Sequence, residues 1–120
     1  MGDKTVKEKS FAFALRIVKL YNYMIEQNKE FVMSKQLLRS GTSIGALVRE
    51  AAHGESKADF IHKMAIAQKE ANETEYWIEL LFQSGYLEEK QYKSISKDCI
   101  EICKMLSSII ITSKKNNLEK

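Results

Sequence analysis

The sequence predicts an all-α protein, an antiparallel four-helix bundle with up-down-up-down topology. The 120-residue chain contains no proline and only five glycines, too few turn residues for a sheet of many short strands. Four segments repeat apolar residues every three or four positions, the period of an amphipathic helix. Short connections make consecutive helices antiparallel neighbours. We expect the bundle to span residues 1–113, with a frayed tail over residues 114–120.

The first two helices are predicted over residues 10–28 and 34–53. We expect the first helix to face the core with an apolar stripe: Phe11, Leu15, Val18, Tyr21 and Ile25. Residues 31–33 (FVM) should fold back as an apolar plug. Ser34 is the predicted N-cap of the second helix, and Gly54 its left-handed C′ residue.

The third and fourth helices also have recognisable ends. Ser56 and Asp59 form an acidic variant of the capping box that opens the third helix, and Gly85 follows its last residue, Ser84. The fourth helix should begin near Glu88. Its core positions follow heptad spacing, which is typical of a seam packed against other helices: Tyr92, Ile95, Cys99, Ile102, Leu106 and Ile109.

Gly41 and Gly45 are unusual because they lie inside the second predicted helix, where each costs about 1 kcal/mol. Either the helix breaks there or close packing offsets the cost. If the second and third helices fold back around residues 54–56, Gly45 faces Ala65, and Gly41 lies near two further alanines of the third helix. We therefore expect a tight pair of helices. A phosphate-binding P-loop is excluded, since its lysine and spacing are absent.

The same register brings opposite charges together across this helix pair. Arg39 should meet Glu70 and Glu73, and Glu50 should meet Lys63. These residues and the two glycines form the predicted structural motif.

The charged residues are unevenly distributed along the chain. Residues 1–49 carry nine Lys or Arg and four acids, and residues 90–120 carry seven and three, whereas residues 70–89 carry six acids and no base. A basic surface built from the terminal helices is typical of a protein that binds a polyanion, and it also suits charge-complementary self-association. The candidate nucleic-acid contacts are Arg16, Lys19, Arg49, Lys90, Lys93 and Lys97.

Enzyme chemistry has little support in the sequence. Glu50/His53 and Asp59/His62 are carboxylate-x-x-His pairs of the kind that hold two metal ions in helical bundles, but the other two helices offer no carboxylate at the matching level. Cys99 and Cys103 are interpreted as core thiols, far from either histidine. We therefore expect no catalytic residue, no metal and no cofactor.

The sequence also shows no signal peptide, membrane-spanning segment or disulfide pattern. Its N-terminus is polar, and no apolar run approaches the roughly 20 residues that cross a bilayer. Cys99 and Cys103 are four residues apart on a helix, which separates their Cβ atoms by about 6 Å, whereas a disulfide needs about 4 Å. We expect a cytoplasmic protein with reduced thiols and no membrane partner.

Five segments in two blocks of the sequence match a known pattern: QLLRSGTSIGA at 36–46, REA at 49–51, DFIHK at 59–63, IAQKEA at 66–71 and ETEYW at 73–77. With these segments the sequence resembles a known family, the 23S rRNA-intervening-sequence or four-helix-bundle proteins. The resemblance covers roughly residues 11–112 and includes the spacing between the blocks. One departure is Leu47, where the family pattern has asparagine.

The resemblance implies a four-helix bundle that assembles as a homopentameric ring. It implies a gene within an intervening sequence of bacterial large-subunit ribosomal RNA. Relatives include the accessory protein of diversity-generating retroelements, which binds nucleic acid and a reverse transcriptase through a basic surface. No catalytic residue is implied. The leading hypothesis is a homo-oligomeric scaffold that binds RNA or DNA, and the alternative is a protein-interaction scaffold without nucleic acid.

Overall fold

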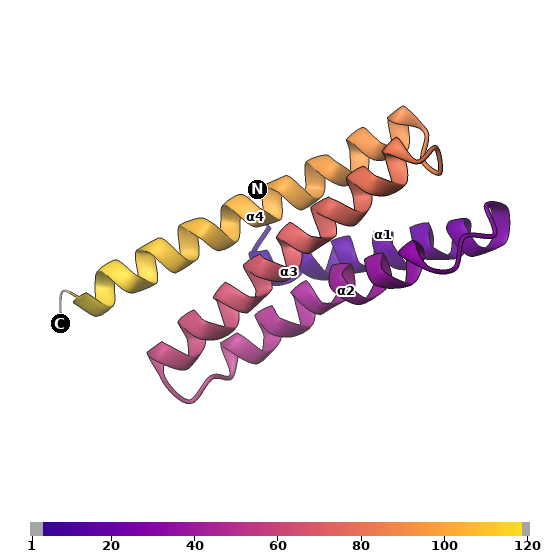
Figure 1. Ribbon diagram of the computed structural model, residues 1–120. Coiled ribbons are helices and arrows are strands. Elements are labelled where there is room, and N and C mark those ends of the chain that lie inside the picture. The colour runs from indigo at the N-terminus through magenta and orange to yellow at the C-terminus, as the bar shows by residue number, and fades with distance from the viewer. Residues whose placement is uncertain (1–3, 119–120) are drawn as a thin grey trace.

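Four helices form the part of the chain described by the computed structural model, residues 4–118. The helices are α1 (Val6–Gln27), α2 (Met33–Ala52), α3 (Lys57–Gln83) and α4 (Glu89–Leu118). Each helix runs antiparallel to the one before it (Figure 1), and no strand occurs among these residues. The predicted all-α four-helix fold is therefore confirmed. None of the described helices is both long and apolar enough to cross a membrane.

The four helices are not packed together equally. α2 lies closely against both α1 and α3, and α3 lies closely against α4, whereas α1 and α4 are the least closely packed of the neighbouring helices. α1 is also shorter than α3 and α4, and begins level with the middle of the bundle (Figure 1). As a result, the α1–α4 seam is the loosest side of the molecule.

The ends of α1 and α3 follow from their capping residues. Thr5 accepts a hydrogen bond from the backbone N–H of Glu8, and the Glu8 carboxylate accepts one from the backbone N–H of Thr5, so α1 starts earlier than predicted. The side chain of Ser56 accepts the N–H of Asp59, which confirms the predicted start of α3. Gly85 follows the last turn of α3 with φ +89°, a conformation that favours glycine.

The start of α2 differs from the prediction. Its cap is the carboxylate of Glu30, which is 7% exposed and accepts the N–H groups of Val32, Met33 and Ser34 at 2.9, 3.1 and 2.7 Å. Ser34 instead donates its hydroxyl to the Glu30 carbonyl at 2.7 Å, so the Ser34 N-cap is wrong. The apolar plug is wrong for Phe31 and Val32, which are 59% and 74% exposed, whereas Met33 packs against the core as predicted.

Gly54, after the end of α2, is required for space and not for a left-handed conformation. Its φ is not positive, which corrects the prediction. A Cβ at this position would lie 2.9 Å from Oδ2 of Asp59 and 3.1 Å from the carbonyl oxygen of Ala51. Glycine therefore allows the α2–α3 turn to close tightly.

One apolar core runs through the bundle. α4 contributes the predicted heptad seam, with Ile95, Cys99, Ile102 and Leu106 at most 3% exposed. α4 continues as helix to Leu118, so residues 114–118 extend the helix, and residues 119–120 of the predicted tail lie outside the described part.

Candidate nucleic-acid and self-association surfaces

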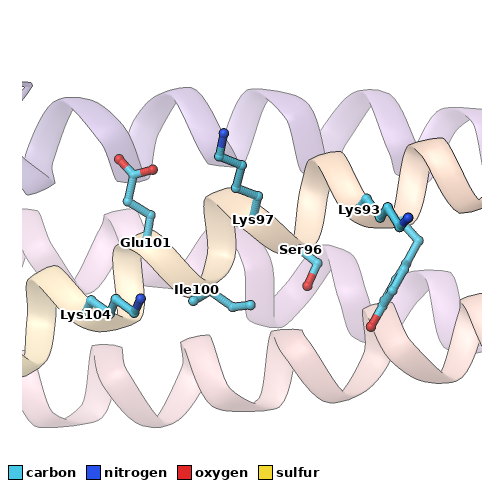
Figure 2. A pocket seen from close by; sticks show the side chains of 7 residues that line it. Lys93, Ser96, Lys97, Ile100, Glu101 and Lys104 are labelled. Atoms are coloured by element: carbon cyan, nitrogen blue, oxygen red, sulfur yellow. The ribbon is translucent and has the colours of Figure 1, made fainter.

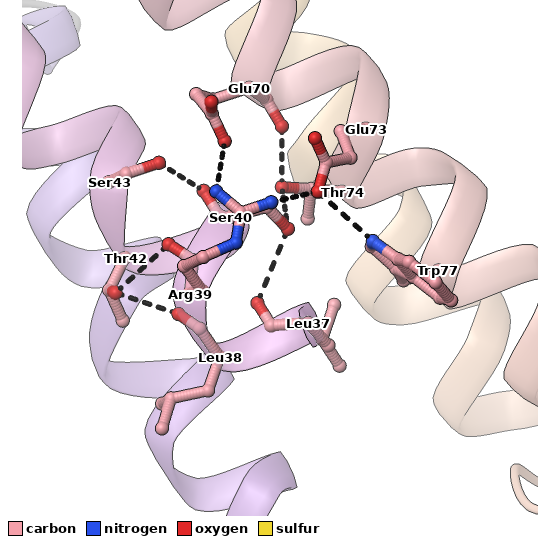
Figure 3. Close-up of polar contacts among 10 residues, drawn as sticks. All are labelled: Leu37, Leu38, Arg39, Ser40, Thr42, Ser43, Glu70, Glu73, Thr74 and Trp77. Carbon is pink, nitrogen blue, oxygen red and sulfur yellow. Dashed lines mark hydrogen bonds and ion pairs between the residues drawn. The ribbon is translucent and has the colours of Figure 1, made fainter. Parts of the chain in front are cut away.

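The predicted ion pairs join α2 to α3. The guanidinium of Arg39 contacts Glu73 and lies 3.2 Å from Oε1 of Glu70 (Figure 3). Glu73 also accepts a hydrogen bond from Nε1 of Trp77 at 3.2 Å. The second predicted pair is present too, since Nζ of Lys63 lies 3.3 Å from Glu50.

Beneath these ion pairs lies a buried polar contact that the sequence analysis missed. Ser40 and Thr74 are fully buried, and their hydroxyl oxygens are 3.0 Å apart, within hydrogen-bond distance (Figure 3). Thr74 also donates to the Glu70 carbonyl at 2.7 Å. Their placement on facing helices could have been found from the same register that predicted Arg39–Glu73.

The glycines of α2 allow close packing, but against α1 and not against α3. A Cβ on Gly41 would lie 2.8 Å from Cγ1 of Ile17, and a Cβ on Gly45 would lie 3.4 Å from the carbonyl oxygen of Ser10. The predicted alanine partners on α3 are therefore wrong. α2 is unbroken, because close contact with α1 offsets the cost of two helical glycines.

A positively charged surface follows the outer side of α4. Lys90, Lys93, Lys97 and Lys104 are exposed and form what we term the lysine face. Three of them line a shallow groove of about 450 Å³ together with Ser96, Ile100 and Glu101 (Figure 2). Lys104 was missed by the sequence analysis, although it lies seven residues after Lys97 and so shares its helical face.

Most of these lysines carry an uncompensated charge. Lys93 lies 3.8 Å from Glu89, and Glu101 is already paired with Lys9 of α1. Within residues 4–118, no ion pair includes Lys90, Lys97 or Lys104. The lysine face therefore presents several ammonium groups to solvent.

Arg16 and Lys19 lie across the α1–α4 seam from this face. They line a groove of about 350 Å³ with Gln91 and Ile95 of α4. Arg16 is held in place, since Nη1 lies 2.5 Å from Asp98 and Nη2 donates to the hydroxyl of Ser94 at 2.7 Å. Lys19 is exposed and, within the described chain, has no ion-pair partner.

Arg49 does not join the other candidate contacts. It lines a shallow surface with Glu50, Glu55 and Asp59 near the α2–α3 turn. Its guanidinium lies over the ring of Phe11, 5.0 Å from the centroid. The α2–α3 turn and the start of α4 lie at opposite ends of the bundle, so Arg49 is not part of the lysine face (Figure 1).

A second exposed surface is apolar. Phe11, Leu15 and Val18 of α1 are 49%, 51% and 40% exposed, and we term them the α1 stripe. The core side of α1 is instead formed by Phe13, Ile17 and Met24. The prediction of a core-facing stripe is therefore wrong for Phe11, Leu15 and Val18, and its other two residues, Tyr21 and Ile25, are only partly buried.

The histidines lie apart from any cluster of metal ligands. His53 and His62 are exposed near the α2–α3 turn. No group of closely spaced metal-ligand atoms among the described residues includes either of them. The paired carboxylate-x-x-His motifs thus do not converge.

The geometry defines a four-helix bundle with one basic and one apolar surface exposed. The chain belongs to the 23S rRNA-intervening sequence protein family, whose model matches residues 2–108. It is similar to a protein of unknown function from the S23 ribosomal protein family of Bacteroides thetaiotaomicron VPI-5482, known from a crystal structure. That similarity has 60% identity and a TM-score of 0.88, over 88% of this chain and 98% of that one. No curated protein matches the chain.

Proposed function

We propose that this protein is a non-enzymatic assembly module that associates with copies of itself and binds RNA or DNA. The observation that carries nucleic-acid binding is the lysine face of α4, with Lys90, Lys97 and Lys104 outside every ion pair of the described chain. Lysine ammonium groups contact phosphates without reading base sequence. The proposed binding is therefore electrostatic and indifferent to sequence.

The dimensions of the lysine face suit a nucleic-acid backbone. Lys93 and Lys104 are separated by about 16 Å along the helix axis, given a rise of about 1.5 Å per residue. That length corresponds to about five base steps of a duplex at about 3.4 Å per step. Several phosphates can therefore be contacted at once.

The first test is a fluorescence-anisotropy titration of an RNA hairpin and a DNA duplex at several salt concentrations. The wild type should show a steep fall of log K with log salt. The triple variant Lys93→Ala/Lys97→Ala/Lys104→Ala should reduce that slope by about 2 to 3, because each phosphate contact contributes about 0.7 to 0.9.

A triple variant with the same loss of charge provides the matched control. Lys35, Lys57 and Lys69 are exposed on α2 and α3, outside the lysine face, and their replacement by alanine should leave most of the salt slope intact. An equal reduction of the salt slope in both triple variants would contradict binding at the lysine face. An absence of binding at low salt would reject nucleic acid as a ligand.

Self-association rests on the α1 stripe. Three large apolar side chains repeat at four- and three-residue spacing and would remain in water in a single chain. A ring requires two different complementary patches on each subunit. Tyr76 of α3, which is 58% exposed, provides apolar surface on a second helix.

Sedimentation of the full chain tests this part of the proposal. The wild type should sediment as an oligomer and Leu15→Glu as a species of lower mass, because the carboxylate would be buried without a partner. Gln36→Glu adds the same group at an exposed position of α2 and should leave the mass unchanged. A monomeric wild type would contradict self-association.

A protein-interaction scaffold that binds no nucleic acid is the second candidate function. The observation that favours it is the exposure of Phe31 and Val32 at the α1–α2 turn. An oligomer that binds neither RNA nor DNA at low salt would select this candidate.

A further inference from the structure

Two thiols and a carboxylate meet between α3 and α4. Cys99 and Cys103 lie one helical turn apart on α4, and Glu75 reaches them from α3. The two Sγ atoms and a carboxylate oxygen all lie within 4.8 Å of one another, and Sγ of Cys103 is 3.1 Å from Oε1 of Glu75. Within residues 4–118 these are the only three ligand-type side chains so placed.

The spacing is close to that of ligands around a tetrahedral metal ion. With bonds of about 2.3 Å to sulfur and about 2.1 Å to oxygen, ligand atoms around zinc lie about 3.5 to 3.8 Å apart. The observed upper limit of 4.8 Å between the three ligand atoms lies about 1 Å above these separations. Thiolate ligands select zinc, cadmium and copper(I) over magnesium or calcium.

We propose that Cys99, Cys103 and Glu75 form a site for one thiophilic metal ion, with zinc as the expected occupant. The fourth coordination position would be open to water on the solvent side. Oδ1 of Asn72 lies 3.7 Å from Sγ of Cys103, so this side chain can hydrogen-bond to such a water. The ion would join α3 to α4 by bonds from both helices.

The burial of the three ligands determines the side from which the ion enters. Cys99 is fully buried, whereas Cys103 and Glu75 are partly exposed, so the site opens on the side of the latter two. The Cys99 thiol donates a hydrogen bond to the Ala71 carbonyl at 3.4 Å, and this bond is given up when the metal binds. Metal binding forms two metal–sulfur bonds and releases both thiol protons to solvent, so affinity increases with pH.

Oxidation to a disulfide does not compete easily with the metal. Cβ atoms four residues apart on a helix are about 6 Å apart, and a disulfide requires about 4 Å. α4 would have to unwind locally to form one.

The test is a Cd²⁺ titration of the reduced full-length protein, followed by the ultraviolet thiolate-to-cadmium charge-transfer band. The band should saturate at one equivalent per chain. Cys103→Ser should remove most of it, and Glu75→Gln should weaken the affinity at least tenfold. Glu79→Gln, which alters an exposed carboxylate one turn further along α3, should change nothing.

A second measurement distinguishes a specific metal site from nonspecific binding of the metal to thiols. Zn²⁺ should raise the melting temperatures of the wild type and of Glu79→Gln, since a ligand stabilises only the state that binds it. The increase should be smaller for Glu75→Gln and Cys103→Ser. Circular dichroism checks that each variant is folded. No band at one equivalent, or equal affinity in Glu75→Gln and Glu79→Gln, would overturn the proposal.

Discussion

α2 and the α1–α4 seam are held by different kinds of contact. α2 has a buried carboxylate cap at Glu30, a glycine against Ile17 and a buried contact between Ser40 and Thr74. The seam is bridged by ion pairs on side chains that are 29–43% exposed. Buried contacts fix the geometry of α2, whereas the seam leaves charged and apolar side chains of α1 and α4 exposed to solvent.

The largest change in stability is expected when the glycines of α2 are replaced by alanine, and the two positions should respond differently. Gly41→Ala would place a Cβ within 2.9 Å of two side-chain atoms of the fully buried Ile17, so the core must shift. We expect a loss of about 1 to 2 kcal/mol after the gain in helix propensity. Gly45→Ala meets its nearest atom at 3.4 Å and should be neutral or stabilising by up to about 1 kcal/mol.

Urea unfolding of both variants measures this difference. Opposite signs, or a gap of at least about 1 kcal/mol, would support close α1–α2 contact at Gly41. Equal stabilisation of both variants would show that α1 lies further from α2 than described.

A smaller change in the free energy of unfolding is expected when the cap of α2 is altered. Burial opposes ionisation of Glu30, but the N–H groups of Val32, Ser34 and Met33 together lower its pKa below the usual value. Because the folded pKa is lowered, the cap stabilises the protein above the unfolded pKa, and this contribution is lost as the pH falls through the folded pKa. Glu30→Gln should cost about 1 kcal/mol at neutral pH.

Unfolding of wild type and Glu30→Gln as a function of pH checks the sign. The difference in stability should shrink as the pH falls below about 4.3, the ordinary pKa of a glutamate. A difference that grows in acid would contradict a charged cap.

The smallest change in stability is expected for a substitution at the α1–α4 seam. Arg16 and Asp98 have side chains that are 41% and 40% exposed, so Arg16→Met should cost less than about 1 kcal/mol, with the difference falling as salt is added. Chemical unfolding at low and high salt measures it. A loss above about 2 kcal/mol would show that the seam is as strongly held as α2.

The sequence predicted the features that depend on local chemistry or on a short turn. Ser56 and Gly85 delimit α3 because caps and left-handed glycines act locally. Arg39–Glu73 and Glu50–Lys63 were predictable because a tight turn fixes which residues of two antiparallel helices face each other.

The orientation of α1 could not be predicted in the same way. This helix has two apolar faces with helical spacing, one through Phe11 and Leu15 and one through Phe13 and Ile17. Periodicity is satisfied by either face, and only packing against α2 and α4 selects the second. The partner of Gly41 was missed for the same reason, since it depends on which face of α1 meets α2.

Lysine acetylation footprinting with mass spectrometry tests the central claim, that the outer side of α4 binds nucleic acid. The modification rate of each lysine is compared with and without a saturating RNA hairpin at low salt. We predict protection of Lys93, Lys97 and Lys104, and unchanged rates at Lys35, Lys57 and Lys69. Protection of the second set, or equal rates throughout in the presence of bound RNA, would contradict this account.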